Sequence, residues 1–170
     1  MTLYRICLLL LTAQPKNRTR RRGTVESIFS NTYSSSIEAS RMVSNDIRLY
    51  WEALNIEEDT MNQAELCLVE MVNNAYEHAY LNQDGPVIEI KSYLQTPRML
   101  LMEISDYGQA LPQEVLVEST GKSFVVPEEN KPETWLTSGR GFIIVEQLMD
   151  TIAYENKDGK NTFYLGKRLN

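Results

Sequence analysis

The segment from residue 60 to residue 80 constrains the fold most, because it carries two lines of side chains at helical spacing. Its apolar line is Ala64, Leu68, Met71, Val72, Ala75 and Ala79. This i, i+4, i+7, i+8, i+11, i+15 series predicts a helix over residues 62–80, starting near Thr60, with one face in a core. The second line, Glu70, Asn74 and His78, places a carboxylate, an amide and an imidazole one turn apart. Such a polar line is either a solvated face or one wall of a ligand site.

Composition predicts one ordinary globular domain, since the 170 residues are 42% hydrophobic and 24% charged. The net charge of −6 is unevenly distributed. Residues 1–23 carry six basic and no acidic residues, so the remainder of the chain carries −12. An acidic body disfavours direct nucleic-acid binding, which requires clustered Lys and Arg. We therefore expect a protein or a nucleotide as the partner.

Residues 1–23 form a basic, flexible N-terminal extension in our interpretation, and residues 24–170 form the folded domain. The apolar run 6–11 is far shorter than the roughly 18 to 20 residues that cross a bilayer, so we expect no transmembrane segment. Most of the basic charge follows this run, unlike in a secretory signal. The extension is either dispensable, which we favour, or a basic arm for an anionic membrane surface or RNA. Two cysteines in unlike contexts, Cys7 and Cys67, favour a reducing compartment, the cytoplasm.

Around the central helix, the pattern predicts an α+β fold. Expected strands cover residues 25–33, 87–94, 99–105, 151–155 and 162–169, and further helices cover 37–54 and 140–149. Ser34 to Ser36 are candidate N-caps of the first helix and Asn55 ends it. Its expected apolar stripe is Ile37, Met42, Val43, Ile47, Tyr50, Trp51 and Leu54. The result is a two-layer α/β sandwich, with a mostly antiparallel sheet covered on one face by helices.

Two glycine-bearing motifs follow the polar helix. In SDYG, Asp106 leaves a strand and could accept a hydrogen bond from an adenine amino group, while Gly108 lets the backbone approach the base. An ordinary Asx turn is the alternative. In SGRG, Thr137 or Ser138 caps the helix over 140–149. Gly139 and Gly141 leave the first-turn amides of this helix open, so these amides could hold phosphate with Arg140 nearby. The alternative is that the glycines allow close packing. The polar segment 109–138, with a short helix at 113–119, is expected to form a lid or a plain insertion.

In order and spacing, these motifs resemble those of the ATP-binding superfamily of gyrase, heat-shock chaperones, histidine kinases and mismatch-repair proteins (GHKL, Bergerat fold). Within it, residues 24–170 resemble the RsbW-type anti-sigma factor serine/threonine kinases. VEMVNNAYEHAY is similar to the N box, SDYG to the first glycine box, and SGRGFIIVEQLMD to the second. Ala110 stands where many members carry a second glycine, and Arg140 lies at an often apolar position.

The resemblance implies a role for each site residue. Glu70 would be the catalytic base and Asn74 the Mg²⁺ ligand, and Thr162 would lie near the adenine. From the residues themselves, Glu70 could take a proton from an attacking hydroxyl and Asn74 could offer its oxygen to magnesium bound to ATP phosphates. The nucleotide-binding residues are then Asn74, Asp106, Gly108, Ser138, Gly139, Arg140, Gly141 and Thr162. His78 is interpreted as shaping a site or a contact, not as a phosphoacceptor.

The implied function is that of an ATP-dependent serine/threonine kinase in bacterial partner switching. Its substrate would be an anti-sigma-factor antagonist of the STAS-like kind, and a sigma factor would be a second partner. The resemblance also implies a homodimer. Two alternatives stay open: a non-catalytic module that uses ATP as a regulatory ligand, and the ATPase domain of a histidine kinase. The second is disfavoured because no separate helical segment carries its own phosphoacceptor histidine.

Overall fold

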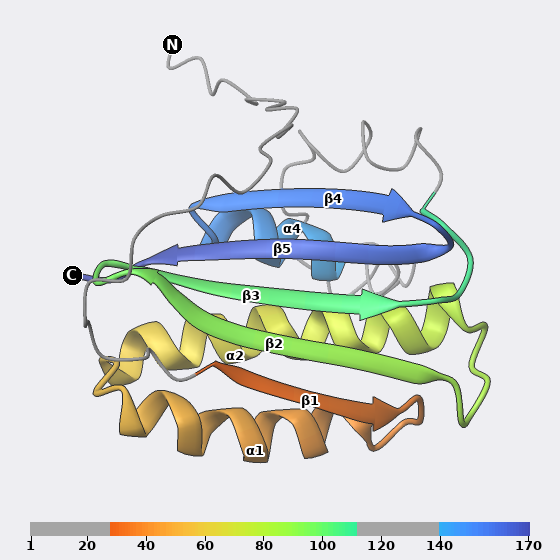
Figure 1. Ribbon diagram of the computed structural model, residues 1–170, viewed down its shortest axis with the longest axis horizontal. Helices are drawn as coiled ribbons and strands as arrows, with labels where there is room; N and C mark the ends of the chain where they lie inside the picture. Colours follow the sequence, from red (N-terminus) through yellow and green to blue (C-terminus); the bar gives the residue numbers. More distant parts are fainter. Residues whose placement is uncertain (1–27, 112–139) are drawn as a thin grey trace, which may run out of the picture.

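The computed structural model describes residues 28–111 and 140–170, which form one sheet and one layer of helices (Figure 1). The strands are β1 (Phe29–Ser34), β2 (Val87–Thr96), β3 (Met99–Asp106), β4 (Thr151–Lys157) and β5 (Lys160–Arg168). The helices are α1 (Ala39–Ala53), α2 (Glu58–Asn74) and α4 (Arg140–Leu148), and a π-helical turn, η1 (Ala75–Ala79), directly continues α2. The predicted lid over 109–138 lies mostly outside the described residues, as do residues 1–27.

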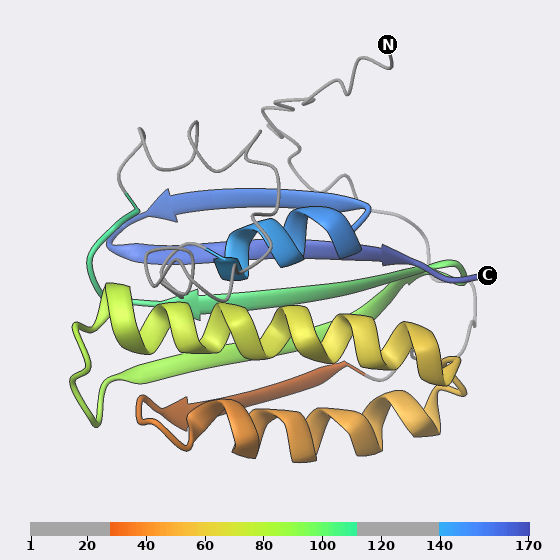
Figure 2. The same ribbon diagram turned by 180° about the vertical axis from the view of Figure 1, so that it is seen from behind.

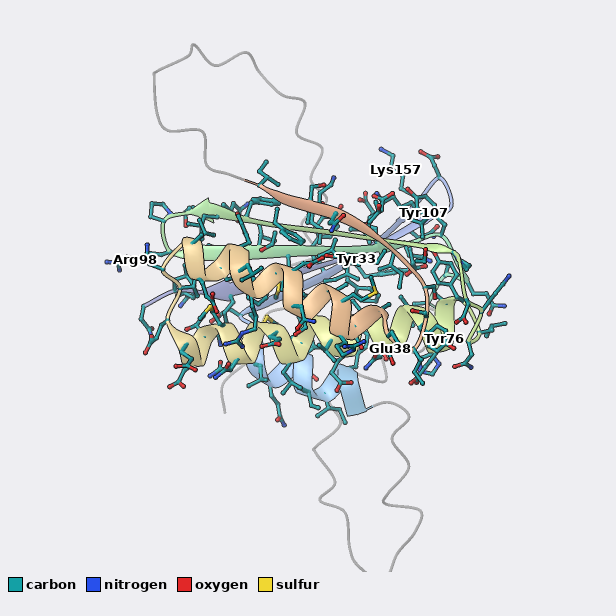
Figure 3. All side chains as sticks on the ribbon, turned by 90° about the horizontal axis from the view of Figure 1, so that it is seen from below. Tyr33, Glu38, Tyr76, Arg98, Tyr107 and Lys157 are labelled. Atoms are coloured by element: carbon teal, nitrogen blue, oxygen red, sulfur yellow. The ribbon has the colours of Figure 1, made fainter. Side chains whose placement is uncertain are left out.

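The sheet is antiparallel throughout, in the order β1-β2-β3-β5-β4. All three helices lie on one face: α1 and α2 cover β1 to β3, and α4 covers β5 and β4 (Figure 2). The edge-on view in Figure 3 shows this two-layer arrangement. The predicted α+β sandwich is therefore confirmed. Within the described ranges, every helix is too short or too polar to cross a membrane.

The core lies between the two layers and is built from the predicted apolar stripes. Val43, Ile47 and Trp51 of α1 are completely buried, as are Leu68 and Val72 of α2. They meet the inward side chains of β2, β3 and β5, which alternate with outward ones along each strand. The fully buried inward residues of these strands include Ile88, Ile90, Leu100, Met102 and Leu165.

A buried hydrogen bond ties α1 to the sheet. The indole N–H of Trp51 donates to Ser92 Oγ in β2 over 3.0 Å. Replacing Ser92 with Ala would leave that N–H buried without a partner, so we expect a loss of about 1–3 kcal/mol in the free energy of unfolding. Urea unfolding measures it. Ser30→Ala makes the same change at an exposed position of β1 and should cost less than about 0.5 kcal/mol. Equal costs for the two variants would contradict this role.

Several local predictions need correction. The first helix begins at Ala39, and no side chain caps it, so Ser34 to Ser36 are not its caps. Ile37 precedes this helix and is 77% exposed, and Met42 is 50% exposed, so the apolar stripe is narrower than predicted. The second helix begins at Glu58, before Thr60.

The turn chemistry behaves as the sequence indicates. Asn55 adopts a left-handed conformation (φ 55°) just after α1, as a residue that ends a helix often does. Asp158 and Gly159 both have positive φ (53° and 79°) and join β4 to β5 through a two-residue turn. The strands run closer to this turn than predicted, to Lys157 in β4 and from Lys160 in β5, where we expected ends at residues 155 and 162.

Candidate functional site

Glu70 and Asn74 lie on the last turns of α2, where the helix changes its hydrogen-bonding pattern. From Ala75 the helix is π-helical, with the amide of Tyr80 donating to the carbonyl of Ala75, five residues earlier. The predicted α-helical line from Glu70 through Asn74 to His78 therefore enters a π-helical turn after Asn74. His78 is exposed. Glu70 and Asn74 thus share the last turns of α2, and His78 lies in the π-helical turn that follows.

Asn74 has one long side-chain hydrogen bond, from its amide nitrogen to the sulfur of Met71 (3.8 Å). Among the described residues nothing donates to its carbonyl oxygen, which stays available to a ligand. In the same part of the chain, no cluster of three or more His, Cys, Asp or Glu side chains could hold a metal ion. Any metal bound here would need most of its ligands from elsewhere.

The carboxylate of Glu70 faces the first turn of α4. A Cβ placed on Gly141 would lie 2.6 Å from Glu70 Oε2, so this glycine allows α4 to approach the carboxylate closely. Glu70 is half-buried, and burial is the main reason that its pKa is raised, with the charge of Glu77 adding to the effect. A carboxyl with a raised pKa beside a helix start is suited to proton transfer.

The carboxylate of Asp106 is 5% exposed at the end of β3, and one of its oxygens is fully engaged. Asp106 Oδ1 accepts the backbone N–H of Gly108 (2.9 Å) and an amide proton of Asn161 (2.7 Å). Burial raises the pKa of Asp106, and these two hydrogen bonds oppose that rise. Residues 28–111 and 140–170 offer no hydrogen bond to Oδ2, so Oδ2 is the oxygen left for a ligand.

The turn after Asp106 rests on the end of the helix that carries Glu70 and Asn74. A Cβ on Gly108 would lie 2.2 Å from the carbonyl oxygen of Ala79, so only glycine allows this approach. The N–H of Gln109 donates to the same carbonyl (2.8 Å), and the N–H of Tyr107 donates to the hydroxyl of Tyr80 (2.8 Å). This packing brings the two sequence motifs into one site.

Thr162 lies on the other face of the sheet from Asp106. In the β3–β5 register, Ser105 is opposite Thr162 and Asp106 is opposite Asn161. Successive side chains alternate between faces, and the Thr162 and Ser105 hydroxyls hydrogen-bond each other over 2.9 Å. The structure thus places Asn161, and not Thr162, beside Asp106. Asn161 lies outside the N box and both glycine boxes, and only the pairing of β3 with β5 brings it beside Asp106.

The second glycine motif is only partly described. Ser138 and Gly139 lie outside the described residues, as does the side chain of Arg140, whose backbone begins α4. The helix is anchored at its other end, where the Lys167 ammonium donates to the carbonyl of Leu148 (2.7 Å). A cation at a helix C-terminus is favourable, and it fixes α4 against β5.

A separate hollow of about 730 Å³ lies beside the same turn, lined by Leu81, Val87, Glu89 and Tyr107 among others. Glu70, Asn74 and Asp106 are not in its lining. Figure 3 shows Tyr107 on the sheet side, away from the helices. Its hydroxyl donates to Glu89, which also binds the Lys160 ammonium (both 2.5 Å). This cluster supports the turn from outside, and the hollow shares Gly108 and Ala79 with the candidate site.

The chain belongs to the family described as the histidine kinase-like ATPase domain, which matches residues 34–167. Its relatives include the anti-sigma F factors of Clostridium acetobutylicum, at 28% identity, and of Clostridium kluyveri, at 25% identity. These matches cover 65% of this chain and 71% and 72% of the relatives, respectively. The predicted resemblance to RsbW-type anti-sigma factor kinases is thereby confirmed.

Solved structures show the same fold. Part of a chain in the crystal structure of the RsbU and RsbW domains of a Mycobacterium tuberculosis protein aligns with a TM-score of 0.59 at 19% identity, over 84% of this chain. The match covers 32% of that chain. The SiaB–SiaC complex from Pseudomonas aeruginosa gives a chain with a TM-score of 0.54 at 13% identity, covering 82% of this chain and 89% of that one.

Proposed function

We propose that this protein binds Mg-ATP and transfers its γ-phosphoryl group to a serine or threonine of a protein partner. One observation carries the proposal. The Asp106 turn packs, through Gly108, directly on the end of the helix that bears Glu70 and Asn74. This packing holds three groups together: Asp106, an acceptor for a nucleobase; Asn74, a ligand for magnesium; and Glu70, a candidate proton acceptor.

The residues present fit ATP. Asp106 Oδ2 is free to accept a hydrogen bond from the adenine amino group, while Oδ1 is held by Gly108 and Asn161. The absence of a side chain at Gly108 keeps the turn against η1. On the phosphate side we propose the start of α4, with Ser138, Gly139, Arg140 and Gly141, because a helix N-terminus favours an anion.

The residues also fit magnesium as a companion of the nucleotide. Mg²⁺ usually keeps several waters and takes one or two protein ligands together with substrate phosphates. Asn74 would supply one oxygen, in agreement with the lack of a dedicated metal cluster in the described part of the chain. When bound, the ion neutralises phosphate charge.

Glu70 would perform the proton transfer. The partner hydroxyl would attack the γ-phosphorus, a new O–P bond would form, and the bond from phosphorus to the ADP oxygen would break. Glu70 would take the hydroxyl proton as the bond forms. Its place beside the first turn of α4 puts the carboxylate next to the proposed phosphate end.

The partner that we propose is an anti-sigma-factor antagonist, and a sigma factor would be held through another surface. The anti-sigma F relatives support this assignment, and so does the SiaB–SiaC neighbour, a protein complex.

We also propose a homodimer, in the cytoplasm. Burial raises the pKa of the Cys67 thiol to about 12, so this free cysteine is unreactive. A non-catalytic ATP-binding module is the second candidate, because Ala110 departs from the common glycine motif.

Thermal unfolding with and without Mg-ATP tests binding. At 100 times the dissociation constant, a ligand stabilises the native state by about 2.7 kcal/mol, so the melting temperature of the parent should rise. Asp106→Ala should lose most of this rise, and Asn74→Ala should lose its dependence on Mg²⁺. Asp59→Ala, an exposed change at the start of α2, should keep both. No rise in the parent would contradict ATP binding. Turnover of ATP with candidate partners separates the kinase from the non-catalytic module.

A further inference from the structure

Asn161 lies at the centre of a hydrogen-bonded network beside the proposed base-recognition residue. It is 2% exposed and begins the part of β5 that pairs with β3. Its amide nitrogen donates to Asp106 Oδ1 (2.7 Å) and lies 3.3 Å from the backbone carbonyl oxygens of Gly108 and Gln109. One side chain therefore contacts both the carboxylate and the turn that follows it.

The orientation of this amide is fixed from the opposite side. The Asn161 carbonyl oxygen accepts the hydroxyl of Tyr154 (2.8 Å) and the amide of Asn156 (2.7 Å), both from β4. A flipped amide would set an oxygen against a carboxylate and two carbonyls, and an NH₂ group against two donors. The carboxylate and the two carbonyls, which can only accept, therefore favour the orientation with the Asn161 NH₂ group toward Asp106.

Tyr154 is itself held in place. Its hydroxyl accepts the backbone N–H of Leu111 (3.1 Å), which leaves its own proton for Asn161. Its ring packs against Phe163 with centroids 4.8 Å apart. The chain of contacts thus runs from Leu111 through Tyr154 and Asn161 to Asp106, and it ends on Oδ1.

We infer that Asn161, held by Tyr154, is a specificity-determining positioning residue that fixes Asp106 with Oδ2 alone turned to the nucleotide base. Oδ1 is saturated by two donors from the protein, so the carboxylate presents a single acceptor. One fixed acceptor selects a base with an amino group, and it disfavours a base with an oxo group at the same place, because two acceptors would meet. The inference rests on the proposed ATP binding and adds how adenine is selected.

The test compares binding of Mg-ATP and Mg-ITP by calorimetry, because ITP carries an oxo group in place of the 6-amino group. The full-length parent should prefer ATP by about 10- to 100-fold, the range for a hydrogen bond to a charged group. Asn161→Leu and the isosteric Asn161→Asp should each reduce that preference to less than about threefold. Tyr154→Phe removes only the hydroxyl that orients Asn161, and should reduce the preference in part.

Tyr164→Phe is the matched control. Tyr164 is also on β5, but its hydroxyl donates to Glu155 on the other face of the sheet (3.2 Å). This variant should keep the parental ATP-to-ITP ratio. A changed ratio in the Asn161 and Tyr154 variants would then not result from the loss of a tyrosine hydroxyl or a general loss of stability. Circular dichroism checks that each variant is folded.

Each outcome has a distinct meaning. One result is a parent that prefers ATP while folded Asn161→Leu and Tyr154→Phe variants keep the ratio within twofold. That result overturns the inference and leaves the proposed function intact. A parent that binds both nucleotides equally well overturns the inference and the assignment of Asp106 to the base. A parent that binds neither overturns the proposed function, and the inference falls with it.

Discussion

Glu70→Gln should reduce phosphotransfer about 100- to 10,000-fold, the usual contribution of a general base, while Mg-ATP affinity stays within about threefold. The substitution keeps the shape of the side chain and its contact with Gly141, and it removes the proton acceptor. Single-turnover transfer of labelled phosphate from ATP to the antagonist measures the rate. Retained transfer would remove Glu70 from the role of base.

The pH profile offers an independent check on the same residue. Burial, and then the charge of Glu77, raises the pKa of Glu70. A base must be ionised to act, so the rate should fall on acidification, starting at a higher pH than for an ordinary glutamate, whose pKa is about 4.3. Glu77→Gln is the matched control, since Glu77 is exposed. It should shift this fall to lower pH and leave the rate at neutral pH within about twofold. An unchanged profile in Glu77→Gln would contradict the coupling.

Gly108→Ala should weaken Mg-ATP binding by at least about tenfold and destabilise the fold by about 1–3 kcal/mol or more, the range for an added methyl group in a packed site. The new Cβ would lie 2.2 Å from the carbonyl oxygen of Ala79, which is backbone and cannot swing away. The turn would have to move, and the contact from Gln109 N–H to Ala79 and the position of Asp106 would change with it.

Calorimetry and urea unfolding measure the two effects of Gly108→Ala. Gln109→Ala alters the neighbouring exposed residue and leaves the backbone contact in place, so it should behave like the parent. Equal affinities for Gly108→Ala and the parent would show that the close approach of the turn to η1 is not needed for the nucleotide.

Local chemistry explains which parts of the fold were predictable. The apolar stripe of α2 and the Asp158-Gly159 turn each depend on residues that are close in the sequence, and both are present as predicted. The prediction of N-caps at Ser34 to Ser36 failed because β1 ends at Ser34 and the helix starts with a backbone hydrogen bond, from Ala39 N–H to Ser36 O (3.0 Å), without a side-chain cap. Ile37 and Met42 match the helical period of the apolar residues but are exposed. The period alone does not tell how wide a strip of the helix the sheet covers.

The sequence by itself determined the α+β class and placed Glu70 and Asn74 one helical turn apart, because hydrophobic period and turn chemistry act over a few residues. It also singled out Asp106 and Gly108 as a strand end with room for close approach. Only the tertiary structure decided that Gly108 meets Ala79 and that Asn161 instead of Thr162 lies beside Asp106. These facts depend on strand register and on helix packing between residues 29 to 55 positions apart. A shift of one residue in such pairing moves every side chain to the other face of the sheet.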